Sequence, residues 1–157
     1  MSVFRRQLAF TLIELLITVA VIGIVFAFAI PFYRSYIDTA NMAKINSAYQ
    51  TAIRYTREAM ARNDTRMSMG LPSNLPTTTQ GWIKLYDPTG GGQAPGGGAI
   101  YRVYGTISLS KATKIGAVVV ASPNHNSWVD FWRPAYKDLK AQYVRVERTG
   151  DVVTKDL

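Results

Sequence analysis

The stretch RRQLAFTLIELLITVAVIGIVFAFAIPFY, residues 5–33, is the most apolar part of the chain and decides its architecture. Residues 15–32 contain no charged side chain. A helix rises about 1.5 Å per residue, so this length matches a hydrocarbon core of about 30 Å. The segment is therefore long enough to span a membrane.

A secretory signal peptide is the competing interpretation of the same segment. Two arginines, Arg5 and Arg6, precede the apolar run, and Ala27–Ala29 has the small-x-small pattern of a cleavage site. Cleavage there would release a soluble protein that begins at Ile30. Glu14 opposes this interpretation, because a carboxylate in an apolar run costs a few kcal/mol on insertion and gives secretion no benefit. In both interpretations the arginines stay in the cytoplasm and the chain after residue 33 is exported.

Glu14 needs a counter-charge in apolar surroundings, and the run after it offers no Lys, Arg or His. A cut after Ala9 would create one, since the new α-amine of Phe10 lies one helical turn before Glu14. The same amine could reach the Glu14 of a neighbouring molecule. The carboxylate would then select the axial register between packed helices.

Residues 10–37, FTLIELLITVAVIGIVFAFAIPFYRSYI, resemble the processing signal and first helix of type IV pilins, the subunits of bacterial surface filaments. The resemblance covers the basic leader of residues 1–9 and the positions Phe10, Glu14, Gly23, Pro31, Tyr33 and Tyr36. It implies that a prepilin peptidase cuts between Ala9 and Phe10 and N-methylates Phe10, and that Glu14 is needed for assembly. Type IV pilins usually have glycine before the cut; Ala9 departs from that pattern but is also small.

The resemblance implies a structural subunit of a type IV pilus, with no enzymatic activity and no cofactor. Its expected partners are copies of itself, the prepilin peptidase, the inner membrane and the pilus assembly machinery. The body would lie outside the cytoplasm, first at the inner membrane and then in the extracellular filament. The alternatives are a type II secretion pseudopilin, a minor pilin that binds DNA, and a monomeric binding domain that is anchored or secreted.

Gly23 and Pro31 predict a weak segment in the apolar helix. Glycine costs a helix about 1 kcal/mol relative to alanine, and proline removes one backbone hydrogen bond and presses on the carbonyl of Ala27. A gentle kink is the alternative for the isolated subunit. For the assembled filament we predict local melting between Gly23 and Pro31.

Residues 34–63 predict an amphipathic continuation of the helix that packs on the body. Apolar residues follow a spacing of three and four, as in a helix with one buried face. The stripe consists of Ile45, Ala48, Tyr49, Ala52, Ile53, Ala59 and Met60. We expect the helix to run from Phe10 to about Asn63.

Residues 64–99 are rich in Pro, Gly, Ser and Thr and predict a long connecting loop. Trp82 and Tyr86 are expected to anchor its first half on the body. Its GGGQAPGGG sequence is not a phosphate-binding loop, because the Lys-Ser/Thr ending is missing.

Residues 100–157 predict the sheet and the C-terminal region of an α+β fold. Runs of β-type residues occur at 99–109, 114–121, 127–133, 141–148 and 151–155. We expect an antiparallel sheet of about four strands, with one face on the amphipathic helix. Because the chain has no cysteine, we expect the hairpin of residues 142–155, with Tyr143 or Val144 buried, to hold the C-terminus in place of a disulfide.

The chain is basic, and its formal charge of +8 falls to +6 when Arg5 and Arg6 leave with the leader. Basic residues alternate with aromatic ones, which could form a DNA-binding strip. The candidates are Arg102, Arg133, Lys137, Arg145 and Arg148. We favour the simpler interpretation, a solvated basic face with the aromatic rings in the core.

Catalytic and metal sites are not predicted. His125 is the only histidine and lies in a turn-like SPNHNS sequence, where a solvated loop position is expected. The acidic residues near the C-terminus lack the ligand spacing of a calcium site. They are Asp130, Asp138, Asp151 and Asp156.

Overall fold

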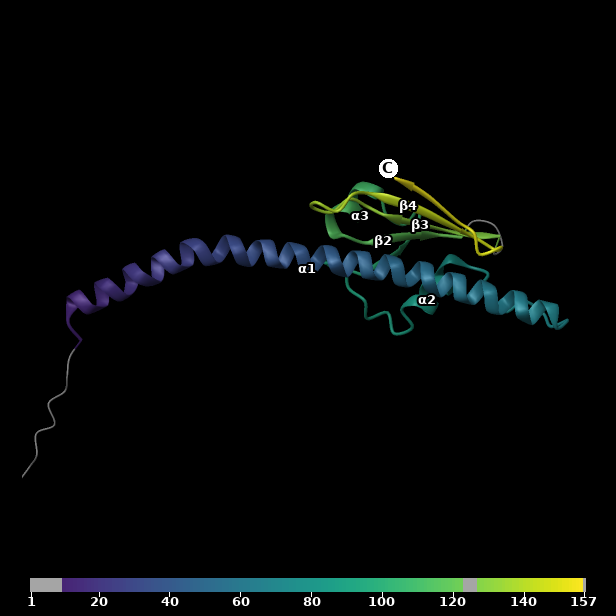
Figure 1. The fold of residues 1–157 in the computed structure, drawn as a ribbon, viewed down its shortest axis with the longest axis horizontal. Coiled ribbons are helices and arrows are strands. Elements are labelled where there is room, and N and C mark those ends of the chain that lie inside the picture. Colours follow the sequence, from purple (N-terminus) through teal and green to yellow (C-terminus); the bar gives the residue numbers. More distant parts are fainter. Residues whose placement is uncertain (1–9, 123–126, 157) are drawn as a thin grey trace, which may run out of the picture. The chain divides into compact units, whose positions relative to one another are not determined.

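The computed structural model describes residues 10–122 and 127–156 (Figure 1). The leader, the predicted cleavage residue Ala9 and the loop histidine His125 lie outside these ranges. The chain divides into two compact units that meet at Thr39 and Ala40. Helix α1, Leu12–Ser68, contributes its first part to one unit and its second part to the other.

The second part of α1 supplies one wall of the hydrophobic core. The predicted stripe is confirmed, because five of its residues are buried and Ala48 and Ala59 pack against them half-buried; the five are Ile45, Tyr49, Ala52, Ile53 and Met60. The helix continues to Ser68, beyond the expected end at Asn63. Buried Asn63 accepts hydrogen bonds from Ser73 Oγ at 2.8 Å and Asn74 N at 3.1 Å, which fix the chain where it reverses.

A second helix lies within the segment predicted to be loop. Helix α2, Thr79–Tyr86, begins at Thr78, whose side chain accepts a hydrogen bond from Gly81 N at 3.1 Å. Trp82 and Tyr86, four residues apart, both point into the core, so their expected anchoring role is confirmed. The short helix forms because this cap and these two buried rings outweigh the loop-like composition around them.

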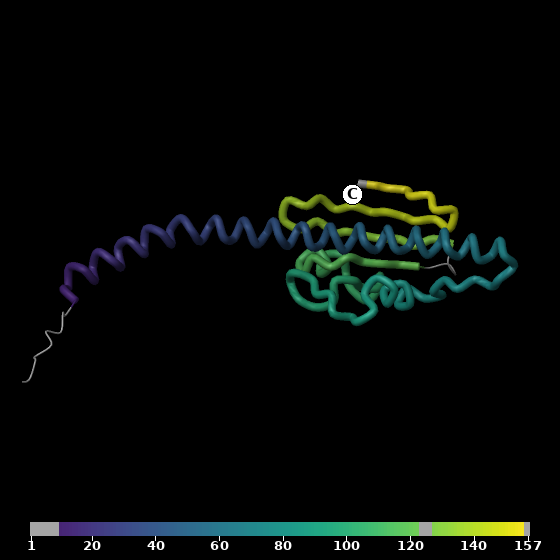
Figure 2. The backbone as a smooth tube through the Cα atoms, turned by 60° about the horizontal axis from the view of Figure 1, so that its bottom comes forward, coloured from purple at the N-terminus to yellow at the C-terminus, as the bar shows by residue number. Residues whose placement is uncertain are grey.

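The body contains one five-stranded sheet in the order β1-β2-β3-β4-β5. The strands are β1 Tyr101–Val103, β2 Val118–Ala121, β3 Trp128–Arg133, β4 Gln142–Glu147 and β5 Val152–Asp156. The α+β class is confirmed. In Figure 2 the second part of α1 lies over the sheet, with β5 at one edge.

The sheet is mixed rather than purely antiparallel, because β1 pairs with β2 in parallel while the other three pairs are antiparallel. Parallel neighbours need a crossover of about a dozen residues, usually with a helix. Helix α3, Leu109–Ile115, is that crossover. It is capped by the Ser108 side chain at its start and by left-handed Gly116 at its end. Both of its ends overlap runs predicted to be strand, 99–109 and 114–121, and there the prediction is wrong.

The face of the sheet that packs on α1 is apolar. Side chains alternate along a strand, so every second residue of β2, β3 and β4 points to this face. The residues are Val118, Val120, Val129, Phe131, Val144 and Val146, all buried. The core therefore consists of the α1 stripe, the α2 rings and this one sheet face.

The C-terminal hairpin forms as predicted and needs no disulfide. Five residue pairs join β4 to β5, from Gln142 opposite Asp156 to Val146 opposite Val152. Val144 is the buried residue of β4, whereas Tyr143 is half-buried on the other face. Backbone pairing and one valine therefore attach the last strand to the body.

Alkaline pH is expected to unfold the body. Burial raises the pKa of Tyr101 to about 12 and also raises that of Tyr86, whereas an unfolded tyrosine titrates near 10. The folded state therefore favours the neutral phenols, and this contribution is complete below pH 10 and lost as the pH rises from about 10 to 12. Thermal melts of the detergent-solubilised chain between pH 8 and pH 12 measure the loss.

Two variants check the assignment of this alkaline transition. Tyr101→Phe should flatten the pH dependence, although it also removes the hydrogen bond from Tyr101 Oη to the Ala48 carbonyl at 2.8 Å. Tyr104→Phe, at a position where 55% of the side chain is exposed, is the matched control. Equal slopes for the two variants would contradict the assignment.

Candidate assembly site

The first part of α1 has no cover within its own unit. Every residue from Phe10 to Ile37 is exposed, including Leu12 at 84% and Phe32 at 74%. Among the described residues, α1 is the one helix that is long and apolar enough to cross a membrane. An apolar surface of this size marks contact with a membrane or with other proteins.

A capping box closes the start of α1. Thr11 Oγ1 and Thr11 N both donate to Glu14 Oε2, at 2.7 and 2.9 Å, and Glu14 N donates back to Thr11 Oγ1 at 3.3 Å. The carboxylate therefore satisfies a backbone donor that the helix leaves unpaired. This contact was not predicted, although a Thr-x-x-Glu pattern before an apolar run is the sequence signature of a capping box.

Glu14 lies where its charge is favourable for a second reason. The N-terminal end of a helix carries a partial positive charge, which stabilises an acid in the first turn. Both bonds from Thr11 end on Oε2 of Glu14, so among residues 10–122 and 127–156 the other oxygen, Oε1, is left for a further donor. Phe10 directly precedes Thr11, the capping partner of Glu14, while Ala9 is outside the described residues.

Gly23 and Pro31 lie within unbroken helix in the single chain. A Cβ atom built on Gly23 would have no neighbour within 4 Å, so glycine is not required there by packing in the isolated molecule. The helix therefore carries two locally weak positions without breaking at either. Melting between them concerns the filament and stays a prediction.

The five basic residues of the predicted DNA strip do not share one face. Arg133 lies in the core with 9% exposure; it donates to Asn46 Oδ1 and to the Lys140 carbonyl and covers the Tyr49 ring at 5.3 Å. Its side chain is thus excluded from a solvent-facing strip. The other four stay candidates only by prediction: Arg102, Lys137, Arg145 and Arg148 are half-buried or exposed.

Arg145 forms an ion pair with the buried carboxylate of Asp130. Its Nε and Nη2 donate to the two oxygens of Asp130 at 2.7 and 3.1 Å, and its guanidinium lies 4.7 Å from the Trp128 ring. Tyr143 Oη also donates to Asp130 Oδ1. Burial raises the pKa of Tyr143 most, and this hydrogen bond raises it further, so the phenol stays protonated and remains a donor. Within the described residues, no three His, Cys, Asp or Glu side chains gather as a metal site.

Comparison with known proteins identifies the family. Residues 4–30 match the family model of the prokaryotic N-terminal methylation motif. The chain is also 31% identical over 130 residues to fimbrial protein Q of Moraxella bovis, an alignment that covers 75% of this chain and 80% of that protein. The chain belongs to the type IV pilin family. No solved structure matches it.

Membership accounts for the features of this site. Pilins are structural proteins that assemble into pilus filaments. The methylation motif ends at residue 30, so it covers most of the exposed apolar helix and includes Glu14 and Gly23. The pilin relative extends the likeness into the body, where the motif alone would not reach.

The capping box should be measurable apart from any filament. Thr11→Val removes the cap, which is worth about 1 kcal/mol, and should lower the exchange protection of the Leu15 amide about fivefold. This amide donates to the Thr11 carbonyl at 3.2 Å. Hydrogen exchange of the unprocessed chain in detergent measures the effect. Thr18→Val is the matched control, because Thr18 bonds only the Leu15 carbonyl, and equal protection in the two variants would contradict the cap.

Proposed function

We propose that this pilin is a structural subunit of a type IV pilus, cut between Ala9 and Phe10 and polymerised through residues 10–33. The observation that carries the proposal is the uncovered apolar helix with a single carboxylate in its first turn. A monomeric binding domain would use that side chain only as a helix cap, for which a neutral glutamine would also serve. A type II secretion pseudopilin and a minor pilin that binds DNA are the alternatives within the class.

The exposed side chains explain why the subunit needs apolar surroundings. Fully burying one Leu, Ile, Val or Phe side chain removes about 1.5–3 kcal/mol of unfavourable hydration. More than a dozen such residues between Phe10 and Ile37 are at least half exposed. The membrane supplies these surroundings before assembly, and the helices of other subunits would supply them in the filament. The body would lie outside the cytoplasm throughout.

The charge on Glu14 supplies specificity that apolar contacts lack. A lipid tail is as apolar as a leucine, so packing alone distinguishes poorly between a neighbouring helix and the bilayer. Methylation of the Phe10 amine leaves it cationic, and Glu14 Oε1 is the oxygen that Thr11 leaves open for it. Such a pair between copies would be desolvated, and loss of one partner would cost about 3–5 kcal/mol.

The helix between Gly23 and Pro31 is proposed to unwind on assembly. This part of α1 is continuous helix in the single chain, so the unwinding would occur only when the subunit joins the filament. Unwinding would lengthen this part of the chain, because an extended residue rises about 3.3 Å against 1.5 Å in a helix. A density map of the filament with continuous helix from Gly23 to Pro31 would refute it.

Intact mass and N-terminal sequence of the protein from its native cell surface test the proposed processing. We expect a chain that starts at N-methylated Phe10 and is recovered from sheared filaments. This result would support the prepilin peptidase as a partner. A chain that starts at Ile30 would make residues 1–29 a discarded signal peptide and would refute the proposed function.

Substitutions at Glu14 can separate its charge from its capping role. Glu14→Gln keeps an oxygen that can accept from Thr11, because glutamine also serves in capping boxes, but it loses the charge. We expect the amount of sheared filament to fall at least about tenfold in Glu14→Gln. Thr11→Val keeps the charge and loses the cap, so its loss of filament should be much smaller.

Quantitative blots of sheared and membrane fractions measure both variants, and equal membrane levels exclude a defect in insertion. Wild-type amounts of filament from Glu14→Gln would show that charge pairing is not required. A larger loss in Thr11→Val than in Glu14→Gln would assign the role of Glu14 to helix capping instead.

A further inference from the structure

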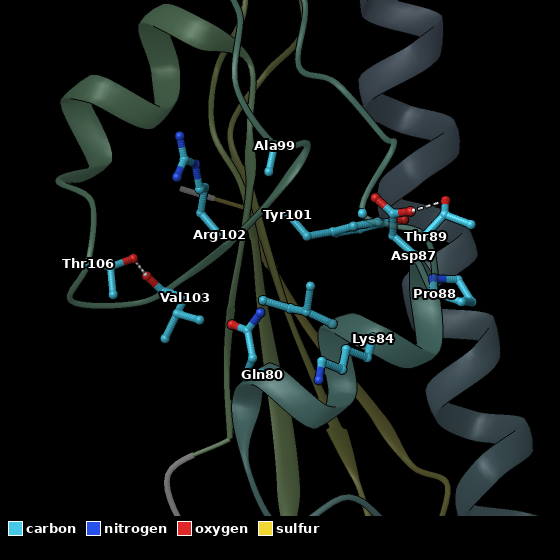
Figure 3. A pocket seen from close by; sticks show the side chains of 12 residues that line it. Gln80, Lys84, Asp87, Pro88, Thr89, Ala99, Tyr101, Arg102, Val103 and Thr106 are labelled. Atoms are coloured by element: carbon cyan, nitrogen blue, oxygen red, sulfur yellow. Dashed lines mark hydrogen bonds between the residues drawn. The ribbon is translucent and has the colours of Figure 1, made fainter.

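A groove of about 560 Å³ lies beside β1, at one edge of the sheet (Figure 3). Helix α2 contributes Gln80, Ile83 and Lys84 to its wall, and the turn that follows contributes Asp87 and Thr89. Strand β1 contributes all three of its residues. The groove is thus an open channel along a strand that has a neighbour, β2, on one side only.

The unpaired edge of β1 faces away from β2 with free backbone groups. Val118 N donates to the Ile100 carbonyl at 2.8 Å and Tyr104 N donates to the Val120 carbonyl at 2.9 Å. In a parallel ladder these bonds assign the N–H and C=O of Arg102 to β2, so those of Tyr101 and Val103 point outward.

One outward group on β1 is already occupied. The Val103 carbonyl accepts from Thr106 N at 3.1 Å and from Thr106 Oγ1 at 2.7 Å. Tyr101 N–H, Tyr101 C=O and Val103 N–H have no hydrogen-bond partner among the residues that the structure describes. Three backbone groups in a row beside a groove form a template for an added strand.

The charges of the groove favour an acidic strand. Lys84 and Arg102 line it, and the Nε of Arg102 is buried without a hydrogen-bond partner in the described chain. The one acid of the lining, Asp87, is satisfied locally, since it accepts from Gly91 N at 3.2 Å and Gly92 N at 2.8 Å. Lys84, Arg102 and Asp87 together give the lining of the groove a net side-chain charge of +1.

The opposite edge of the same sheet supplies a strand of matching character. Residues 151–156, which contain β5, have the sequence DVVTKD; two aspartates and Lys155 give the segment a formal charge of −1, opposite to that of the groove. Its apolar residues Val152 and Val153 are 39% and 51% exposed, which is unusual for an edge strand without a partner.

The unpaired edge of β5 can be assigned in the same way as that of β1. Glu147 N donates to the Asp151 carbonyl at 2.9 Å. In an antiparallel ladder, bonded and non-bonded pairs alternate, so Val153 bonds β4 while the backbone groups of Val152 and Thr154 point outward.

We propose that the groove beside β1 receives β5 of a second copy of this chain, edge to edge, so that the sheets of two bodies join. The contact uses different surfaces on the two copies, β1 on one and β5 on the other. Such heterologous contacts repeat along an open filament rather than close into a dimer. The inference rests on the proposed function, because it assigns a contact between bodies in the filament that the apolar helices build.

Cysteine cross-linking in intact filaments tests the contact, because the native chain contains no cysteine. Facing residues on paired strands have Cβ atoms about 4.5–5.5 Å apart, within reach of a short bifunctional cross-linker that alkylates two thiols. The double variants Val103→Cys with Val152→Cys and Val103→Cys with Thr154→Cys cover two registers. We expect a ladder of covalent multimers from at least one of them and monomer from each single variant.

Control variants separate this contact from random collision. Ser110→Cys with Thr154→Cys places the first thiol on exposed α3 instead of β1 and should give monomer. Thr154→Pro removes an N–H that points away from β4, so the body should melt as in the wild type while the filament yield falls about tenfold. Val153→Pro removes an N–H that bonds β4 and should lower the melting temperature of the body itself.

The outcomes are distinct. Intact filaments that give only monomer in both double variants would overturn the inference and leave the proposed function standing, and so would an equal ladder from the control pair. Linkage of Val103→Cys to a different protein would also overturn it. Absence of filaments from the unmodified chain would refute the proposed function itself.

Discussion

The structure depends on one constraint: a single helix must satisfy two different environments. Its second part has a narrow apolar stripe, and the body is built to cover that stripe and nothing more. Its first part is apolar all round, with exposed leucine, isoleucine and phenylalanine on every side. A helix that is apolar on all faces is stable only inside a membrane or a larger assembly. The fold of one chain is therefore incomplete without its surroundings.

The outer face of the sheet buries one carboxylate, that of Asp130, and satisfies it with side chains of the neighbouring strand. Asp130 is only 4% exposed, and such burial of a carboxylate is costly unless it is paired and hydrogen-bonded. Here it accepts two bonds from Arg145 and one from Tyr143, all between β3 and β4. Removing Arg145 would leave the acid without its charge partner, whereas the backbone pairing of β4 with β5 would persist.

The α1 stripe could be predicted from sequence because helical spacing is a local property. Tyr49 and Met60 both lie at the positions that this spacing predicts to be buried. The parallel pairing of β1 could not, because it follows from the short α3 crossover, whose Ser108 cap lies inside a run of β-type residues. The sequence also did not indicate that the Arg133 side chain points into the core. Strand β3 reads WVDFWR, with an aromatic ring on each face, so alternation alone does not tell which face is buried.

The acid in the apolar helix has two roles that demand the same side chain. Capping requires an acceptor oxygen three residues after Thr11, which glutamate and glutamine both provide. Pairing with an amine in apolar surroundings requires a negative charge, which glutamate alone of the two provides. The geometry allows both at once, because Thr11 uses only one oxygen of Glu14. The cap also fixes the direction of the carboxylate before any neighbour arrives, so less rotamer freedom is lost when a second subunit pairs with it.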